Sequence, residues 1–252
     1  MNAIDLQRPD LLPESLRARL QSIESLCRNE KFSEKLVQHR KVRNIVIELD
    51  SYCMDRRVLG IHYTRAIRTD IEHNGLLVRT GAEIRDEFVQ RFGEEFGAGE
   101  LRQLQRLWSS HQEKQANIRD SMLWFNFTLS AYGNSGSAHL LGMYGGEQIH
   151  MGIAMDTPVG KKLASIGEPL LVKCSLDPHK VKTCIEHPWG KILVSSFHIK
   201  VEPEAFRIDQ DGKVTESISP EDLVVESALT SNGLSPIVCE QKSGCSAPHT
   251  RR

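Results

Sequence analysis

The order of two hydrophobic patterns along the chain most constrains its fold. Before residue 58, apolar side chains recur at steps of three and four residues, which predicts helices. In the second half, short runs rich in β-branched and aromatic residues predict strands. Helices first and strands later predict an α+β fold, not alternating βαβ units.

The helical predictions cover most of the first half. A helical region spans 14 to 43, with a fresh start at Ser33. Residues Asn44–Cys53 are compatible with a helix end or a strand, and a helix continuing from Lys35 is favoured. A further helix follows Thr64 and ends at Gly75, and two more span 82 to 91 and 100 to 113.

Strands are predicted mainly in the second half. The short run Val58–Thr64 is β-rich, and Met122–Ser130 has strand composition. Pro169–Leu176 and Lys191–Val201 also predict strands, and Asp211-Gly212 predicts a hairpin turn. The end of the chain, 229 to 252, is rich in Ser, Gly and Pro and predicts disorder.

Composition narrows the class of protein. The 252 residues suit one large domain or one domain with an appendage, and a net charge of −1 gives no global attraction to nucleic acid. No run approaches the roughly 18 apolar residues of a membrane span, and the N-terminus lacks a secretory signal, so a cytoplasmic protein is expected. Six scattered cysteines form no CxxC pair and predict free thiols, and no metal site is predicted.

The sharpest local motif is Gly60-Ile61-His62-Tyr63-Thr64, followed by a helix ending Asn74-Gly75-Leu76-Leu77. This stretch resembles the ADP-ribosyltransferase superfamily, in particular the diphtheria-toxin and poly-ADP-ribose-polymerase branch with its bacterial toxin-like members. The resemblance covers Val58 to Leu77 and reaches weakly to Leu176. It implies a split, bent β-sheet core over 58 to 228, flanked by an N-terminal helical segment over 1 to 57, with NAD as co-substrate.

The resemblance implies roles for the first strand. His62 would hydrogen-bond the adenosine ribose, and Tyr63 with Thr64 would hold the nicotinamide amide. Because neighbouring strand residues point to opposite faces, His62 and Thr64 share a face and Tyr63 points away. A neutral imidazole can donate to a ribose hydroxyl without adding charge. The alternative is a buried strand histidine bonded to backbone.

An arginine and a second strand would complete the binding site. Arg79 lies nearest the strand–helix unit, and a guanidinium gives a bidentate clamp on a diphosphate. In the run Phe125-Asn126-Phe127-Thr128, Phe127 and Thr128 would supply the aromatic and hydroxyl beside the nicotinamide. The alternative is that these aromatic residues belong to the core.

The remaining part is a carboxylate. Cleavage of the nicotinamide–ribose bond develops oxocarbenium character, which an acid on the ribose 2′-hydroxyl stabilises. Glu147 follows Tyr144 and two glycines, which let a ligand approach the backbone closely. Glu168 follows a glycine and opens a strand. Glu147 is favoured by a small margin, and Tyr144 is expected beside the cofactor.

The functional prediction is a toxin- or defence-like transferase that moves ADP-ribose from NAD to a macromolecule. Nucleic acid is slightly favoured over protein as acceptor, with Arg56 to Arg91 as a candidate groove wall. Toxin-like relatives also raise the expectation of a neutralising partner protein. The alternatives are an NAD glycohydrolase of the same fold and a non-enzymatic ligand-binding module.

Overall fold

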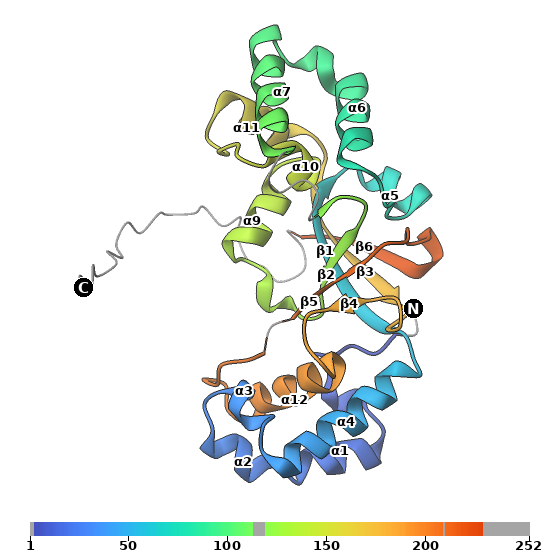
Figure 1. Ribbon diagram of the computed structural model, residues 1–252, viewed down its shortest axis with the longest axis vertical. Helices are drawn as coiled ribbons and strands as arrows, with labels where there is room; N and C mark the ends of the chain where they lie inside the picture. The colour runs from blue at the N-terminus through green and yellow to red at the C-terminus, as the bar shows by residue number, and fades with distance from the viewer. Residues whose placement is uncertain (1–2, 113–118, 209, 229–252) are drawn as a thin grey trace, which may run out of the picture.

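The structure is a computed structural model that describes residues 3–112, 119–208 and 210–228. Helices surround one six-stranded antiparallel sheet, a mixed arrangement that is compatible with the predicted α+β class (Figure 1). The helices are α1 Glu14–Gln21, α2 Glu24–Asn29, α3 Ser33–Leu36, α4 Arg40–Met54, α5 Arg68–Asn74, α6 Gly81–Phe92, α7 Ala98–Gln112, α9 Ser135–Gly142, α10 Gly146–His150, α11 Pro158–Ser165 and α12 Pro188–Val201. The strands are β1 Val58–Ala66, β2 Leu123–Asn126, β3 Glu168–Leu176, β4 Lys182–Thr183, β5 Asp211–Val214 and β6 Leu223–Ser227.

The central strand of the sheet pairs along its whole length with one neighbour and only briefly with the other. The strand order is β4-β5-β2-β1-β3-β6. The central strand β1 pairs with β3 along all nine of its residues, from Val58 with Leu176 to Ala66 with Glu168. With β2, in contrast, β1 has one register pair, Ile61 with Asn126. Beyond Ile61 the two strands separate, and this separation leaves room for the candidate site.

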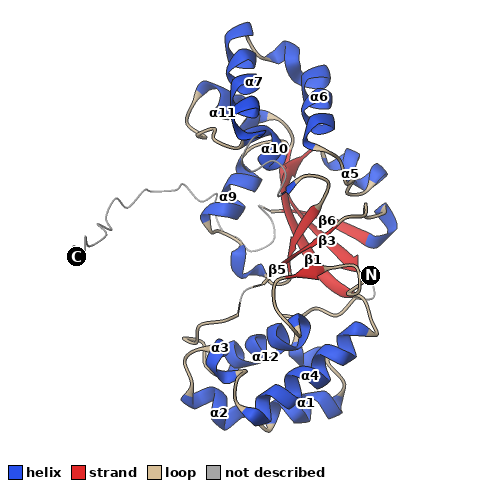
Figure 2. Ribbon diagram, in the orientation of Figure 1, coloured by secondary structure: helices blue, strands red, loops and turns tan. Residues whose placement is uncertain are grey.

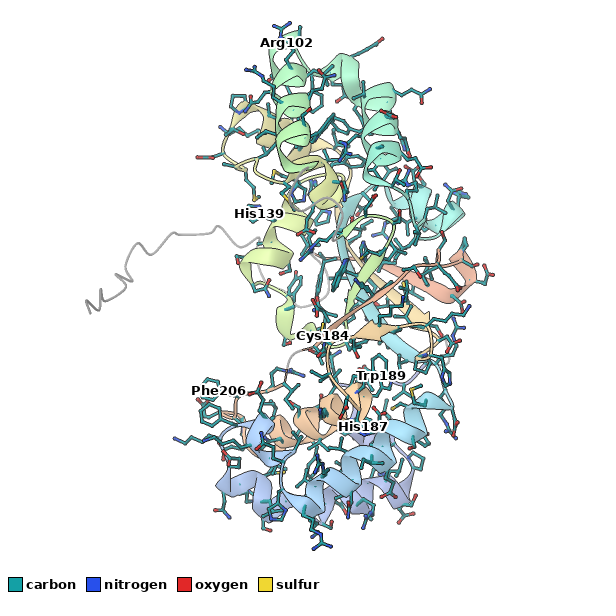
Figure 3. The ribbon with its side chains drawn as sticks, viewed as in Figure 1. Arg102, His139, Cys184, His187, Trp189 and Phe206 are labelled. Atoms are coloured by element: carbon teal, nitrogen blue, oxygen red, sulfur yellow. The ribbon has the colours of Figure 1, made fainter. Side chains whose placement is uncertain are left out.

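One face of the sheet is covered by helices from both ends of the chain. The N-terminal helices and α12 form a layer below the sheet in Figure 1, and their apolar side chains join one core with β1, β2 and β3. Helix α12 crosses α4 closely, since a Cβ on Gly190 would lie 2.0 Å from the carbonyl oxygen of Val46. The carboxylate of Asp50 accepts from the backbone nitrogens of Trp189 and Gly190 and thereby caps α12. Figure 3 shows Trp189 at this junction.

The other end of the sheet carries a second helical cluster. Helices α6, α7, α10 and α11 pack around their own apolar core, which includes Phe88 and Met143 (Figure 2). Helix α9 covers the opposite face of β1, where Ile61 and Tyr63 pack. None of the helices in the described ranges is long and apolar enough to cross a bilayer.

Several predicted elements agree with the structure. The strand from Val58 is present as β1, the helix after it ends at Gly75 with a φ of 74°, and the two charged helices are α6 and α7. Residue 113, the predicted end of the second charged helix, lies outside the described ranges, as does the tail 229–252. The helix over Asn44–Cys53 is confirmed, although α4 begins anew at Arg40. The region 14 to 43 is broken into short helices.

The strand predicted over Lys191–Val201 is wrong, because these residues form α12. Most of this helix is buried, including the polar residues Ser195, Ser196 and His198, so its sequence shows no separate polar face from which a helical period could be read. The sequence does contain one signal for the start of α12 that the strand prediction overlooked: Pro188, a residue favoured in the first turn of a helix.

Two boundaries also differ from the prediction. Strand β2 ends at Asn126 instead of Ser130, because Leu129–Ala131 form a short 3₁₀ helix that Thr128 caps. Asp211-Gly212 is not a hairpin turn but opens β5, with Asp211 opposite Asn126. A Cβ on Gly212 would lie 2.8 Å from a methyl carbon of Val181, so this glycine serves close packing and not a turn.

Candidate functional site

A cavity of about 560 Å³ lies where β1 and β2 separate. Its wall is formed by β1, β2, α5, α6, α9 and the segment 144–148. The volume falls within the range of pockets that bind small molecules and cofactors. Six of the nine residues predicted for the NAD site line this one cavity: His62, Tyr63, Thr64, Arg79, Tyr144 and Glu147.

His62 spans the gap between the separated strands. Its Nδ1 lies 2.9 Å from the carbonyl oxygen of Trp124. A carbonyl only accepts, so Nδ1 carries the proton, and burial lowers the pKa of His62 and favours the neutral ring. In this tautomer Nε2 accepts a hydrogen bond. A ligand hydroxyl would therefore donate to His62, the reverse of the direction assumed from the sequence.

The two residues that follow His62 lie on opposite faces of β1: Thr64 shares the face of His62, and Tyr63 lies on the other face. Register places His62 and Thr64 opposite Val172 and Leu170, which belong to the main core. Tyr63 faces the α9 side, where it stacks on Tyr132 with ring centroids 6.3 Å apart. Residues from both faces of β1 therefore line the cavity, because β2 no longer pairs with β1 at this point.

Two buried donors in the cavity wall have no acceptor among the described residues. They are Nε of Arg79 and Nε1 of Trp124. A buried donor without a partner costs roughly 1–3 kcal/mol. Both groups would gain a partner if a ligand rich in acceptor oxygens entered the cavity.

Arginine–carboxylate pairs surround the same cavity. They are Arg79 with Glu87, Arg91 with Asp70, and Arg119 with Glu147, and all six residues line the wall. Their side chains are 32–46% exposed. Pairs this exposed are each worth about 0–1 kcal/mol, so an anionic ligand can compete for the arginines at little cost.

Glu147 enters the cavity from an unusual backbone turn. Gly145 and Gly146 have φ values of 86° and 63°, a left-handed conformation that glycine adopts readily. Glu147 then lies in the first turn of α10 and pairs with Arg119. Tyr144 packs edge-on against Phe92 at 5.0 Å, and burial raises the pKa of its hydroxyl.

Glu168 lies outside this cavity. Its carboxylate receives hydrogen bonds from Arg68 at 3.0 and 3.4 Å and from the hydroxyl of Ser227 at 3.2 Å. Hydrogen bonding to Arg68 lowers the pKa of Glu168. These contacts tie the start of β3 to α5 and β6. The structure therefore brings together His62 and Glu147 but not His62 and Glu168.

Phe127 and Thr128 also lie outside the cavity. Phe127 is buried in the main core and packs edge-on against Trp189, with ring centroids 4.8 Å apart. Thr128 is buried and its hydroxyl contacts that of Ser130 at 2.7 Å. Both residues lie past the end of β2. For Phe127 the alternative stated above holds: its aromatic ring belongs to the core.

Three cavity residues escaped the sequence analysis. Asp211 lines the cavity from the start of β5, but Asp-Gly resembles a turn and hid the strand. Trp124 lies within the predicted strand Met122–Ser130 but was given no role in the site, and Arg119 carries no local motif. The basic region Arg56 to Arg91 contributes Arg65, Arg79 and Arg91 to the wall, while other arginines of that region make contacts elsewhere.

Comparisons with protein-family models, curated proteins and solved structures found no match. Within the described ranges, no three or more histidine, cysteine or acidic side chains are grouped so that they could hold a metal ion. The described cysteines are free thiols, and burial raises the pKa of Cys27 to about 11 and those of Cys53 and Cys174 to about 12.

Proposed function

We propose that the chain is an NAD-dependent ADP-ribosyltransferase that modifies a macromolecule. The observation that carries the proposal is the shared cavity of His62 and Glu147, which come from an early strand and a much later turn. The choice of NAD as substrate rests on the resemblance of the first strand to the ADP-ribosyltransferase superfamily.

The cavity chemistry suits a dinucleotide. Neutral His62 accepts from a ribose hydroxyl through Nε2. Arg79 offers its unpaired Nε to a phosphate oxygen, and Arg91 and Arg119 add positive charge beside it. Trp124 offers Nε1 to a further acceptor. These donors and acceptors match the sugars and diphosphate of NAD.

Glu147 is the carboxylate that we assign to the reaction. As the nicotinamide–ribose bond breaks, positive charge grows on the ribose and nicotinamide leaves with the bonding electrons. A carboxylate hydrogen-bonded to the 2′-hydroxyl stabilises this charge, and the acceptor then attacks the anomeric carbon. Asp211 is a second acid in the same wall and could deprotonate the acceptor.

The direct test is nicotinamide release from NAD by purified protein. Glu147→Gln should reduce the rate by at least about 100-fold while the protein stays folded, because general acid–base and electrostatic effects each contribute on this scale. Glu168→Gln is the matched comparison: it should lower stability and retain the rate. Full activity in Glu147→Gln would overturn the assignment of Glu147, and no release by wild type with any acceptor tested would overturn the proposal.

Labelled NAD separates the two enzymatic alternatives. A transferase leaves the ADP-ribose label on a macromolecule, whereas a glycohydrolase releases all of it as free ADP-ribose. We predict retained label when nucleic acid or protein acceptors are supplied. Complete release in every mixture would favour the glycohydrolase.

A further inference from the structure

A basic strip crosses the exposed side of β4, β5 and β2 and ends at the cavity. Register places Lys182 of β4 opposite Lys213 of β5, and Lys213 opposite Trp124 of β2. Residues paired in this way point to the same face of a sheet. Trp124 lines the cavity, so the strip runs from the sheet edge directly to the candidate site. Figure 1 shows β4 and β5 next to β2 in the sheet.

The two lysines of the strip lack acidic partners among the described residues. Neither Lys182 nor Lys213 forms a salt bridge within the described ranges. The ammonium of Lys213 instead lies 5.2 Å from the ring centroid of Trp124, and the guanidinium of Arg119 lies 5.3 Å from the same ring. Trp124, which lines the cavity, therefore has two cations close to its ring.

The pairing of Lys182 with Lys213 is unfavourable within the protein itself. Directly opposed like charges destabilise a sheet. Lysine on an edge strand can discourage aggregation, which would account for Lys182. It does not account for Lys213, because β5 lies between β4 and β2 and is not an edge strand. An anionic partner along the strip would remove the repulsion.

The acids near the strip do not neutralise it. Asp211 lies two residues before Lys213 and so on the same face, but it lines the cavity. Glu147 pairs with Arg119, whose guanidinium lies over the ring of Trp124. Glu216 pairs with Lys180, which lies two residues before Lys182. Within the strip, Lys182 and Lys213 are therefore the two cations without an acidic partner among the described residues.

We propose that this strip, defined as Lys182, Lys213 and Arg119 around Trp124, binds single-stranded nucleic acid and guides it to the cavity. Proteins that bind single strands combine a cationic track for phosphates with aromatic side chains for bases. A single strand also exposes base atoms that a duplex hides, so that they can reach a reacting group in a cavity. The proposal rests on the proposed function in naming this strand as the acceptor.

The test is binding of a labelled 12-nucleotide single strand, as DNA and as RNA, to the full chain without NAD. Fluorescence anisotropy across a salt series gives the affinity and its salt dependence. Wild type should bind, and Lys182→Ala with Lys213→Ala should weaken binding about 10-fold or more and reduce the salt slope by roughly 0.7 per lost contact. Lys180→Ala is the matched control, because Lys180 lies on the same edge and is paired with Glu216.

The outcomes separate this inference from the proposed function. Loss of affinity in the double variant, with wild-type binding in Lys180→Ala, supports the strip. Equal affinity in all three proteins, no binding by wild type at low salt, or equally tight binding of a duplex overturns it. Labelling of a protein acceptor without oligonucleotide binding would overturn the strip and leave the transferase proposal standing. Oligonucleotide binding without nicotinamide release would do the reverse.

Discussion

The ring of His62 joins two strands that have stopped pairing, since its Nδ1 donates to the carbonyl oxygen of Trp124 at 2.9 Å. This bond fixes the tautomer and holds Trp124 beside the cavity. It also satisfies a strand carbonyl that would otherwise face the gap. The separation of β1 from β2 is thus stabilised by the same side chain that we propose contacts NAD.

Arg79 tests the role of the unpaired donor. Arg79→Lys keeps the positive charge and removes Nε, which is buried without an acceptor among the described residues. We expect KM for NAD in nicotinamide release to rise about 10-fold, the equivalent of one charge-assisted hydrogen bond, with kcat little changed. An unchanged KM would show that Arg79 pairs only with Glu87.

A substitution of Phe127 tests whether its aromatic ring lies beside the nicotinamide, as the sequence predicted. Its ring is 1% exposed and packs on Trp189, away from the cavity. Phe127→Leu should lower the free energy of unfolding by about 1–2 kcal/mol, measured by urea denaturation, and leave KM for NAD unchanged. A large rise in KM with no loss of stability would restore the role expected from the sequence.

His150 predicts how stability depends on pH. Burial, and secondarily the neighbouring His139, lowers the pKa of His150 to about 4. The unfolded chain binds this proton at about pH 6.5, so between these values the unfolded state holds more protons than the folded state. The contribution is complete above pH 6.5 and is lost as the pH falls towards 4, by about 3 kcal/mol in all.

Urea denaturation from pH 7.5 to 4.5 checks this dependence. His150→Asn should flatten the fall in the free energy of unfolding, whereas His179→Asn, at a surface turn, should not. The same slope in wild type and His150→Asn would assign the pH dependence to other groups.

The sequence was most informative where local chemistry governs structure. The strand at His62, the glycine that ends α5 and the helix over Asn44–Cys53 follow from periodicity and backbone preference. Helix α12 did not, because burial among α4 and the sheet removes the polar face that marks a surface helix. Tertiary packing and not local preference determines such a segment.

The candidate site shows the same division. His62, Arg79 and Glu147 were chosen from separate motifs, and they line one cavity. Asp211 was missed because its position depends on a pairing with Asn126 that no local pattern reveals. The sequence favoured Glu147 over Glu168 by only a small margin, since each follows a glycine. The structure distinguishes them, because Glu147 lines the cavity whereas Arg68 and Ser227 hold Glu168 outside it.

NAD binding by Glu147→Gln tests the central claim most directly, because this variant is expected to bind NAD without consuming it. Bound NAD at about 100 times Kd stabilises the folded state by about 2.7 kcal/mol, which should raise Tm by about 5–10 °C. His62→Ala in the same background should lose most of this rise. No change in Tm with millimolar NAD, in either Glu147→Gln or wild type, would contradict the account.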